Sequence, residues 1–78
     1  MSADVRFPLM SHDAPDAQGV VARWYVREGE DVLVDQVVAE VQLDKVDVEV
    51  LAPAAGRIHL TVPEGAEVGQ GATIATVA

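Results

Sequence analysis

The chain has 78 residues, of which 50% are hydrophobic, carries a formal net charge of −8 and contains no cysteine. A chain this short forms one small domain, and the lack of thiols excludes disulfides, thiolate metal sites and cysteine nucleophiles. The acidic surface disfavours nucleic acid and anionic membranes as partners. No apolar run approaches the roughly 20 residues of a membrane helix, and the start lacks a signal-peptide layout, so we expect a cytoplasmic protein.

The sequence predicts short strands separated by turns, with no segment of helical periodicity. In chain order we expect strands at residues 5–9, 19–26, 31–34, 37–43, 46–50, 57–62 and 73–77. Loops and turns rich in Gly, Pro, Asp and Ala separate them, at residues 10–19, 28–30, 52–56, 63–65 and 68–71. Many short strands with a turn every few residues indicate a small all-β sandwich or barrel.

Residues 37–50 form the most regular part of the pattern. Apolar residues alternate along residues 37–43, where Val38, Glu40 and Gln42 face the other side, and again along residues 46–50. The alternation breaks at Asp44 and Lys45, so these two residues are predicted to form the tip of a hairpin. Lys45 is the only lysine of the chain, and a lysine-modifying enzyme would therefore find a single side-chain amine.

The sequence also repeats itself. Residues 26–32 match residues 62–68, and residues 38–41 match residues 74–77 at the same offset. One copy alone is too small to bury its apolar face, so the repeat predicts two four-stranded sheets related by a pseudo-two-fold axis. The Lys45 hairpin would join the two copies, with both chain termini at the opposite end of the molecule.

At this point the sequence resembles a lipoyl domain of the dihydrolipoyl acyltransferases of 2-oxo acid dehydrogenase complexes, within the biotinyl/lipoyl-attachment family. The residues that carry the resemblance are Gly19, the segment WYVREG at 24–29, Asp35, Gln36, Asp44, Lys45, Ala52, Pro53, Gly56, Glu64, Gly65, Val68, Gly71, Ile74 and Ala75. The resemblance implies a flattened barrel of two four-stranded antiparallel sheets, with the lysine in a tight turn.

The resemblance also implies roles for individual residues. Lys45 corresponds to the lysine that carries covalent lipoate, and Asp44 to the aspartate that the lipoylating enzyme recognises. Gly29, sixteen residues before Lys45, and Gly56, eleven residues after it, correspond to glycines that shape the lysine hairpin. Val46 stands where the family usually has alanine, and we expect it to point inward.

Carried over as a whole, the resemblance implies a non-catalytic carrier. The lipoyl-lysine would act as a swinging arm that moves acyl groups and reducing equivalents between active sites. The implied partners are a lipoate ligase or lipoyl transferase, a thiamine-dependent 2-oxo acid decarboxylase, the acyltransferase core and dihydrolipoyl dehydrogenase. Residues 1–78 would form one lipoyl domain, the N-terminal part of a longer acyltransferase.

Two alternatives to the lipoyl carrier remain open. A biotinyl carrier domain of a carboxylase has the same fold, but its lysine normally lies between two methionines, whereas Asp44 and Val46 flank Lys45. The second alternative is an unmodified lipoyl-like interaction module. The two histidines, His12 and His59, are far apart in sequence, so we expect no metal site and no acid–base catalysis. Trp24 is predicted to pack between the sheets.

Overall fold

The computed structural model describes residues 2–78; Met1, at which the predicted domain starts, lies outside the described residues. Residues 2–78 contain strands and turns and no helix, and thus no helix long and apolar enough to cross a membrane. The strands in chain order are β1 (Ala3–Arg6), β2 (Gln18–Trp24), β3 (Asp31–Val32), β4 (Val37–Leu43), β5 (Val46–Leu51), β6 (Gly56–Leu60), β7 (Glu67–Gly69) and β8 (Thr73–Val77). The predicted all-β class is confirmed.

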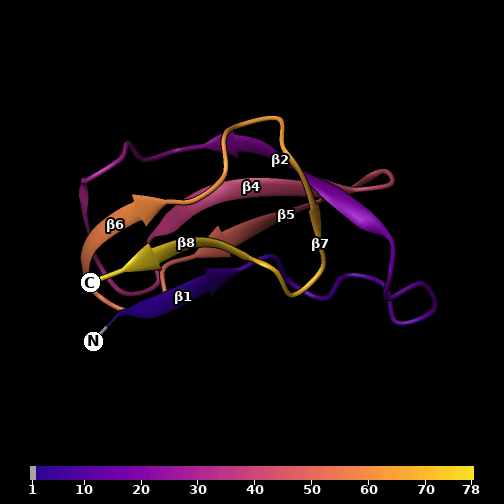
Figure 1. Ribbon diagram of the computed structural model, residues 1–78, viewed down its shortest axis with the longest axis horizontal. Helices are drawn as coiled ribbons and strands as arrows, with labels where there is room; N and C mark the ends of the chain where they lie inside the picture. Colours follow the sequence, from indigo (N-terminus) through magenta and orange to yellow (C-terminus); the bar gives the residue numbers. More distant parts are fainter. Residues whose placement is uncertain (1) are drawn as a thin grey trace.

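The strands form two four-stranded sheets in which all neighbouring strands are antiparallel (Figure 1). One sheet has the strand order β1-β8-β6-β3, and the other has the order β5-β4-β2-β7. Because successive side chains of a strand point to opposite faces, each sheet turns one face to a shared core and the other to solvent. The result is a flattened barrel with extents of 34 × 21 × 18 Å.

The two halves of the chain occupy equivalent places. Exchanging β1, β8, β6 and β3 for β5, β4, β2 and β7 converts one sheet order into the other. Residues 38–41 and residues 74–77 share one burial pattern, and Gly29 and Gly65 share positive φ angles of 81° and 88°. The predicted pseudo-two-fold repeat is therefore confirmed. Each half gives two strands to each sheet, so neither half has a core of its own.

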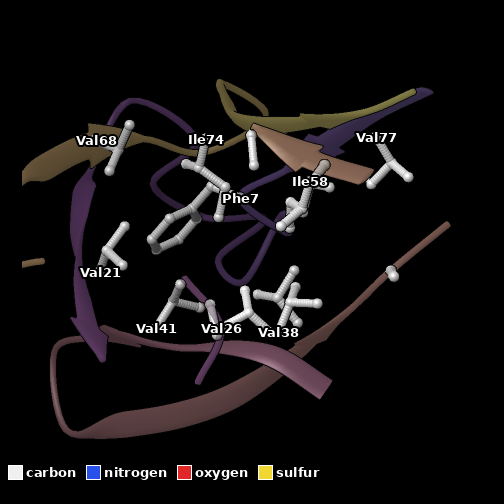
Figure 2. Close-up of a cluster of buried hydrophobic side chains, with 14 of the residues drawn as sticks. Phe7, Val21, Val26, Val38, Val41, Ile58, Val68, Ile74 and Val77 are labelled. Carbon is white, nitrogen blue, oxygen red and sulfur yellow. The ribbon is translucent and has the colours of Figure 1, made fainter. Parts of the chain in front are cut away.

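Phe7 is fully buried in the core, among valine and isoleucine side chains from both sheets (Figure 2). The other buried hydrophobic residues are Val5, Val21, Val26, Val32, Val38, Ala39, Val41, Leu43, Val50, Ala52, Ile58, Val68, Ile74, Ala75 and Val77. None of the buried residues in the described chain is polar or charged, and residues 2–78 enclose no detectable pocket. This core supports the fold but offers no binding cavity.

Trp24 packs against the margin of this core, while Phe7 takes the central position. The Trp24 side chain is half-buried, and its indole N–H donates a hydrogen bond to the carbonyl oxygen of Val62 at 3.1 Å. A large ring with one polar atom suits such a site, because the apolar part packs inward and the N–H keeps a partner.

The alternation predicted for β4 is wrong at Val38. The sequence pattern assigned Val38 to the polar face, but Val38 and Ala39 are both fully buried. The pairing of β4 with β5 shifts register between Val37 and Ala39, and such a bulge can turn two successive residues inward. Alternation alone gives no sign of a bulge.

Most strand boundaries differ from the prediction by a few residues, and β7 was not predicted at all. Residues 68–71 were predicted to form a turn, but β7 ends at Gly69 and pairs with β2, where Gly19 lies opposite Val68. This strand is too short to show a period and depends on its partner. The first strand was predicted at residues 5–9 but ends at Arg6, two residues before Pro8, which has no N–H to donate to a ladder.

The two ends of the long axis carry different features (Figure 1). The β4–β5 hairpin tip lies at one end, together with the loop between β1 and β2. The N- and C-termini lie at the other end, as the repeat predicted. The hairpin tip therefore lies at the opposite end of the long axis from any chain that continues from the termini.

Candidate functional site: the Lys45 hairpin

Lys45 occupies the second position of a two-residue turn between β4 and β5. Gln42 pairs with Asp47 and Leu43 pairs with Val46, which leaves Asp44 and Lys45 as the tip. Asp44 has a φ angle of 55°, in the left-handed region that the favoured two-residue hairpin turns require at their first position. Aspartate tolerates this conformation better than most residues other than glycine, so the residue before the lysine suits the turn that presents it.

The Lys45 side chain is exposed, and within residues 2–78 it forms no hydrogen bond or ion pair. The backbone of the turn fixes only the point from which the Lys45 side chain extends. Leu43, the last residue of β4, is 6% exposed and anchors the hairpin to the core. The tip thus has a fixed base and a free side chain.

Val46 is 56% exposed, so the prediction that it points inward is wrong. The predicted apolar face of β5 does turn toward the core farther along the strand, because Val48 is half-buried and Val50 is 6% exposed. The hairpin extends past the end of the core, and the residue nearest the tip has nothing to pack against. Lys45 consequently stands clear of the body of the domain.

Acidic residues surround the lysine hairpin. Asp44 and Asp47 are exposed beside the tip, and Glu40 and Glu49 lie opposite each other farther down the same ribbon. The Tyr25 hydroxyl donates a hydrogen bond to Glu40 at 3.0 Å, and this bond raises the pKa of the Tyr25 phenol, with smaller contributions from desolvation and the Glu40 charge. These groups give the face beside Lys45 a negative potential, which favours the approach of a basic partner surface.

Gly29 and Gly56 lie away from the lysine hairpin. Gly29 occupies the turn before β3, and its N–H donates a hydrogen bond to the carbonyl of Ile58 at 2.8 Å. Gly56 begins β6 opposite Val32, where an added Cβ would collide with the carbonyl oxygen of Ala78 at the C-terminus. Both glycines therefore shape the end of the domain that carries the termini, and not the Lys45 hairpin itself.

Among the described residues, the two histidines lie in different parts of the fold, His12 in the loop between β1 and β2 and His59 on β6. His59 pairs with Glu28 at 2.6 Å, and hydrogen bonds from His59 and then from the Leu60 N–H lower the pKa of the Glu28 carboxyl. His12 is exposed in the loop between β1 and β2. Within residues 2–78 no three His, Cys, Asp or Glu side chains gather into a metal site.

The geometry supports one kind of chemistry. A primary amine on an exposed two-residue turn can be reached by another protein without any change in the core. It is arranged to be modified by another protein and then to present what is attached. Fold and site thus define a carrier domain.

Comparison with known proteins identifies the family. Residues 3–77 match the biotin/lipoyl family described as "Biotin-requiring enzyme". The dihydrolipoyllysine-residue succinyltransferase of the 2-oxoglutarate dehydrogenase complex from Bartonella vinsonii subsp. berkhoffii is 32% identical over 78 residues, which are 99% of this chain and 18% of that protein. The dihydrolipoyllysine-residue acetyltransferase of the pyruvate dehydrogenase complex from Zymomonas mobilis subsp. mobilis is 36% identical over 80 residues. The match covers 100% of this chain and 18% of that protein.

A solved structure agrees with these matches. The lipoyl domain of the 2-oxoglutarate dehydrogenase complex from Azotobacter vinelandii superposes with a TM-score of 0.76 at 33% identity, covering 96% of this chain and 94% of that one. The chain belongs to the biotin/lipoyl-attachment family, and it is a lipoyl domain of the type found in acyltransferase components. Members of this type carry lipoate covalently on a lysine and are carriers rather than enzymes. The biotinyl alternative is not favoured.

One residue near the site was missed by sequence reasoning. Gln70, between two glycines in the turn after β7, holds the loop between β1 and β2 through several hydrogen bonds. No periodicity or spacing signals such a role, because the contact joins segments far apart in the chain.

Proposed function

We propose that Lys45 is the lipoylated residue of this domain, and that the lipoyl-lysine serves as the swinging arm of a 2-oxo acid dehydrogenase complex. The observation that carries the proposal is the position of the only lysine, exposed on a two-residue tip at one end of the barrel. A modifying enzyme can enclose this tip without displacing any part of the core.

The residues around Lys45 fit an amide-linked lipoyl group. Acylation removes the charge of the ε-amine, and this breaks no ion pair because Lys45 forms none within the described chain. The turn itself is held by pairing between Leu43 and Val46 and does not depend on the lysine side chain. Attachment therefore leaves the hairpin intact.

Asp44 serves this site in two ways in our proposal. Its backbone adopts the left-handed conformation that the turn needs, and its exposed carboxylate marks the lysine for the lipoylating enzyme. The second role is supported by the resemblance of the pair Asp44 and Lys45 to the family motif. The two roles can be separated experimentally, because asparagine tolerates the same conformation without the charge.

The attached group supplies a dithiolane that can accept an acyl group together with electrons and later give up both. The paired strands β4 and β5 hold the attachment point of the arm beyond the end of the core. Tethering raises the local concentration of the arm at each active site, so the domain itself needs only weak contacts with each enzyme.

The partners follow from the complexes in which the relatives act. We propose a lipoate ligase or lipoyl transferase, a thiamine-dependent decarboxylase, an acyltransferase core and dihydrolipoyl dehydrogenase. The match spans between 10% and 19% of the length of the curated relatives, and 18% of each of the two relatives named above. We therefore propose that residues 1–78 belong to a longer acyltransferase as its N-terminal domain.

Mass spectrometry tests the proposal. Incubation with a lipoate ligase, ATP and lipoate should raise the intact mass by one lipoyl group, and Lys45→Arg should abolish the gain. Biotin ligase with ATP and biotin should leave nearly all of the protein unmodified. A mass gain that persists in Lys45→Arg, or efficient biotinylation of the unaltered chain, would contradict the proposal.

A further inference from the structure

The hairpin that carries Lys45 has two chemically different faces. Residues that lie directly opposite each other on paired strands carry their side chains on the same face of the sheet. Two opposite pairs are apolar and form the inner face of the hairpin: Val46 with Leu43, and Val48 with Val41. The two pairs that alternate with them are polar and form the outer face: Gln42 with Asp47, and Glu40 with Glu49.

The inner face is uncovered where it reaches the lysine. Val41 is fully buried and Leu43 is 6% exposed, so the β4 side of this face belongs to the core. On β5, Val46 is 56% exposed, and Val48 is half-buried where it packs against the core. These two residues, here called the valine strip, give an apolar surface that begins at the residue next to Lys45 and runs toward the core.

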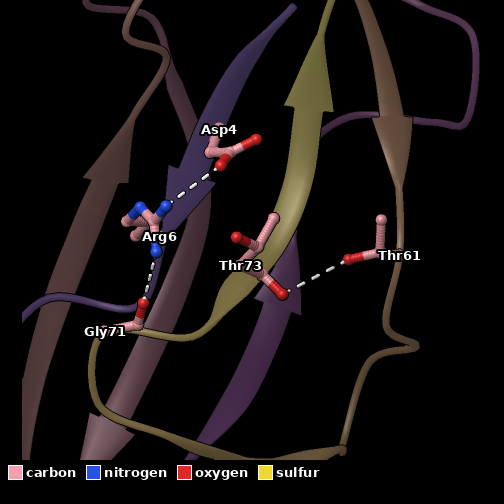
Figure 3. A network of polar contacts seen from close by, with 5 residues as sticks. All are labelled: Asp4, Arg6, Thr61, Gly71 and Thr73. Atoms are coloured by element: carbon pink, nitrogen blue, oxygen red, sulfur yellow. Dashed lines mark hydrogen bonds and ion pairs between the residues drawn. The ribbon is translucent and has the colours of Figure 1, made fainter.

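The outer face, in contrast, is acidic and has no arginine paired with it in the described chain. Within residues 2–78, Arg6 pairs with Asp4 at 3.1 Å (Figure 3) and Arg57 lies 4.0 Å from Asp31. Both pairs belong to the sheet that contains β1 and β6, which is not the sheet of the hairpin. Lys45 is the only basic residue of the hairpin, so its ammonium group is attracted to the outer face and to water.

Acylation of Lys45 with lipoate reverses this preference. The amide carries no charge, so the attraction to the carboxylates of the outer face is lost. The arm gains an aliphatic chain and a dithiolane ring, both of which are apolar. Contact between the arm and the valine strip removes apolar surface of both from water, and attachment to the neighbouring residue keeps the arm at a high local concentration beside the strip.

We propose that the valine strip, Val46 and Val48, is a resting site for the lipoyl arm on the surface of its own domain. The inference rests on the proposed function of Lys45. The contact covers only part of the arm, and the cost of ordering a flexible chain is of the same order as the gain from such a contact. The arm therefore rests on the strip in roughly half of the molecules and is free to swing in the others.

The size of the strip favours the arm over a protein as its occupant. A stable protein interface buries about 800 Å² on each partner, which is far more than two valine side chains offer. An aliphatic chain attached at Lys45 needs no larger surface, because it is already held beside Val46 by a covalent bond. The strip is thus suited to a tethered apolar group.

Nuclear magnetic resonance of the lipoylated protein tests the contact. Lipoylation should produce nuclear Overhauser effects between the arm and the methyl groups of Val46 and Val48, and it should shift the Val48 methyl resonances. Acetylation of Lys45 is the matched control, because it removes the same charge without adding a long apolar chain, and it should shift the Val48 methyls much less. Val34, which is 57% exposed in the turn between β3 and β4, should show no contact with the arm.

Thiol alkylation measures how much of the time the arm is at rest. The chain contains no cysteine, so the thiols of the reduced arm are the only thiols of the protein. Val46→Ser removes apolar surface from the strip at an exposed position and should raise the rate of alkylation by iodoacetamide about twofold, because the arm is then always free. Val34→Ser is the matched control at a similarly exposed valine and should leave this rate unchanged.

Three results would overturn the inference. They are the absence of Overhauser effects between the arm and the strip, equal shifts of the Val48 methyls after acetylation and lipoylation, and equal alkylation rates for the parent and Val46→Ser. Failure of the lipoate ligase to modify Lys45 would contradict the proposed function instead. The resting site would then still be tested, because an activated ester of lipoate acylates the single lysine without an enzyme, and the N-terminal amine that also reacts lies at the other end of the molecule.

Discussion

Replacing Gly19 with alanine adds a single methyl group and should strongly destabilise the fold. Gly19 lies on β2, opposite Val68 of β7, and is buried. A Cβ at this position would collide with Phe7 Cζ and would come within 2.7 Å of the Gln42 carbonyl oxygen and 2.9 Å of Phe7 Cε2. The Phe7 ring is fully buried among core side chains, and Gln42 belongs to the ladder that leads to Lys45, so neither group can move freely.

The expected cost follows from this crowding. Extra atoms in a well-packed core typically cost about 1–3 kcal/mol, and Gly19→Ala belongs in the upper part of that range because it meets both a buried ring and backbone. For a domain of this size each kcal/mol lowers the unfolding midpoint by about 4–8 °C, so a loss of roughly 2–3 kcal/mol should lower it by about 10–20 °C.

Gly69→Ala provides the matched control. Gly69 lies on β7 opposite Gln18, and an added Cβ would meet no atom within 4 Å. This change should be neutral or stabilise by up to about 1 kcal/mol, because alanine reduces the freedom of the unfolded chain. Thermal unfolding followed by circular dichroism compares the two variants with the parent. Equal midpoints for Gly19→Ala and Gly69→Ala would refute the packing argument.

Three further predictions test the site and its surroundings. Asp44→Asn should keep the free energy of unfolding within about 0.5 kcal/mol of the parent but slow lipoylation, whereas Asp44→Val should lose roughly 1–2 kcal/mol because a β-branched residue strains the left-handed turn. Equal ligation rates for the parent and Asp44→Asn would contradict the recognition role. Val46→Ala should lower the free energy of unfolding by less than about 0.5 kcal/mol and Val41→Ala by about 2 kcal/mol or more, because Val46 is 56% exposed and Val41 is 0% exposed. Chemical denaturation measures both losses, and equal losses would contradict the projecting tip. Because the pKa of Glu28 is lowered in the folded protein, its stabilising effect is present above the usual carboxyl pKa of 4.5 and is lost as the pH falls through the folded value. Glu28→Gln should therefore make the unfolding midpoint of the protein depend less on pH on the acid side. A pH profile parallel to that of the parent would contradict the pairing of Glu28 with His59.

Local pattern was sufficient to predict much of the fold. Alternation along residues 37–50 placed the hairpin tip at Asp44 and Lys45, where the turn lies. The internal repeat predicted two equivalent sheets, because a unit that cannot bury its apolar face alone has to pack on its copy. These features depend on residues close in sequence or on the comparison of one half with the other.

The features that were not predicted depend on contacts between distant segments. β7 exists because β2 pairs with it, and three residues cannot display a period of their own. The bulge that buries Val38 arises in pairing with β5, and Val46 is exposed because the core ends before the hairpin does. The hydrogen bonds between Gln70 and the loop between β1 and β2 join residues more than fifty positions apart, so no local signal announces them.

The position of the amine at the hairpin tip is the central claim, and exchanging the two tip residues tests it most directly. A variant with Asp44→Lys and Lys45→Asp keeps the composition, the net charge and the single lysine but moves the amine one position along the turn. After treatment with lipoate ligase, ATP and lipoate, peptide mass spectrometry should find the lipoyl group on Lys45 of the parent and little or none on the exchanged variant. Equal modification of both proteins, or a lipoyl group found elsewhere in the parent, would contradict the account.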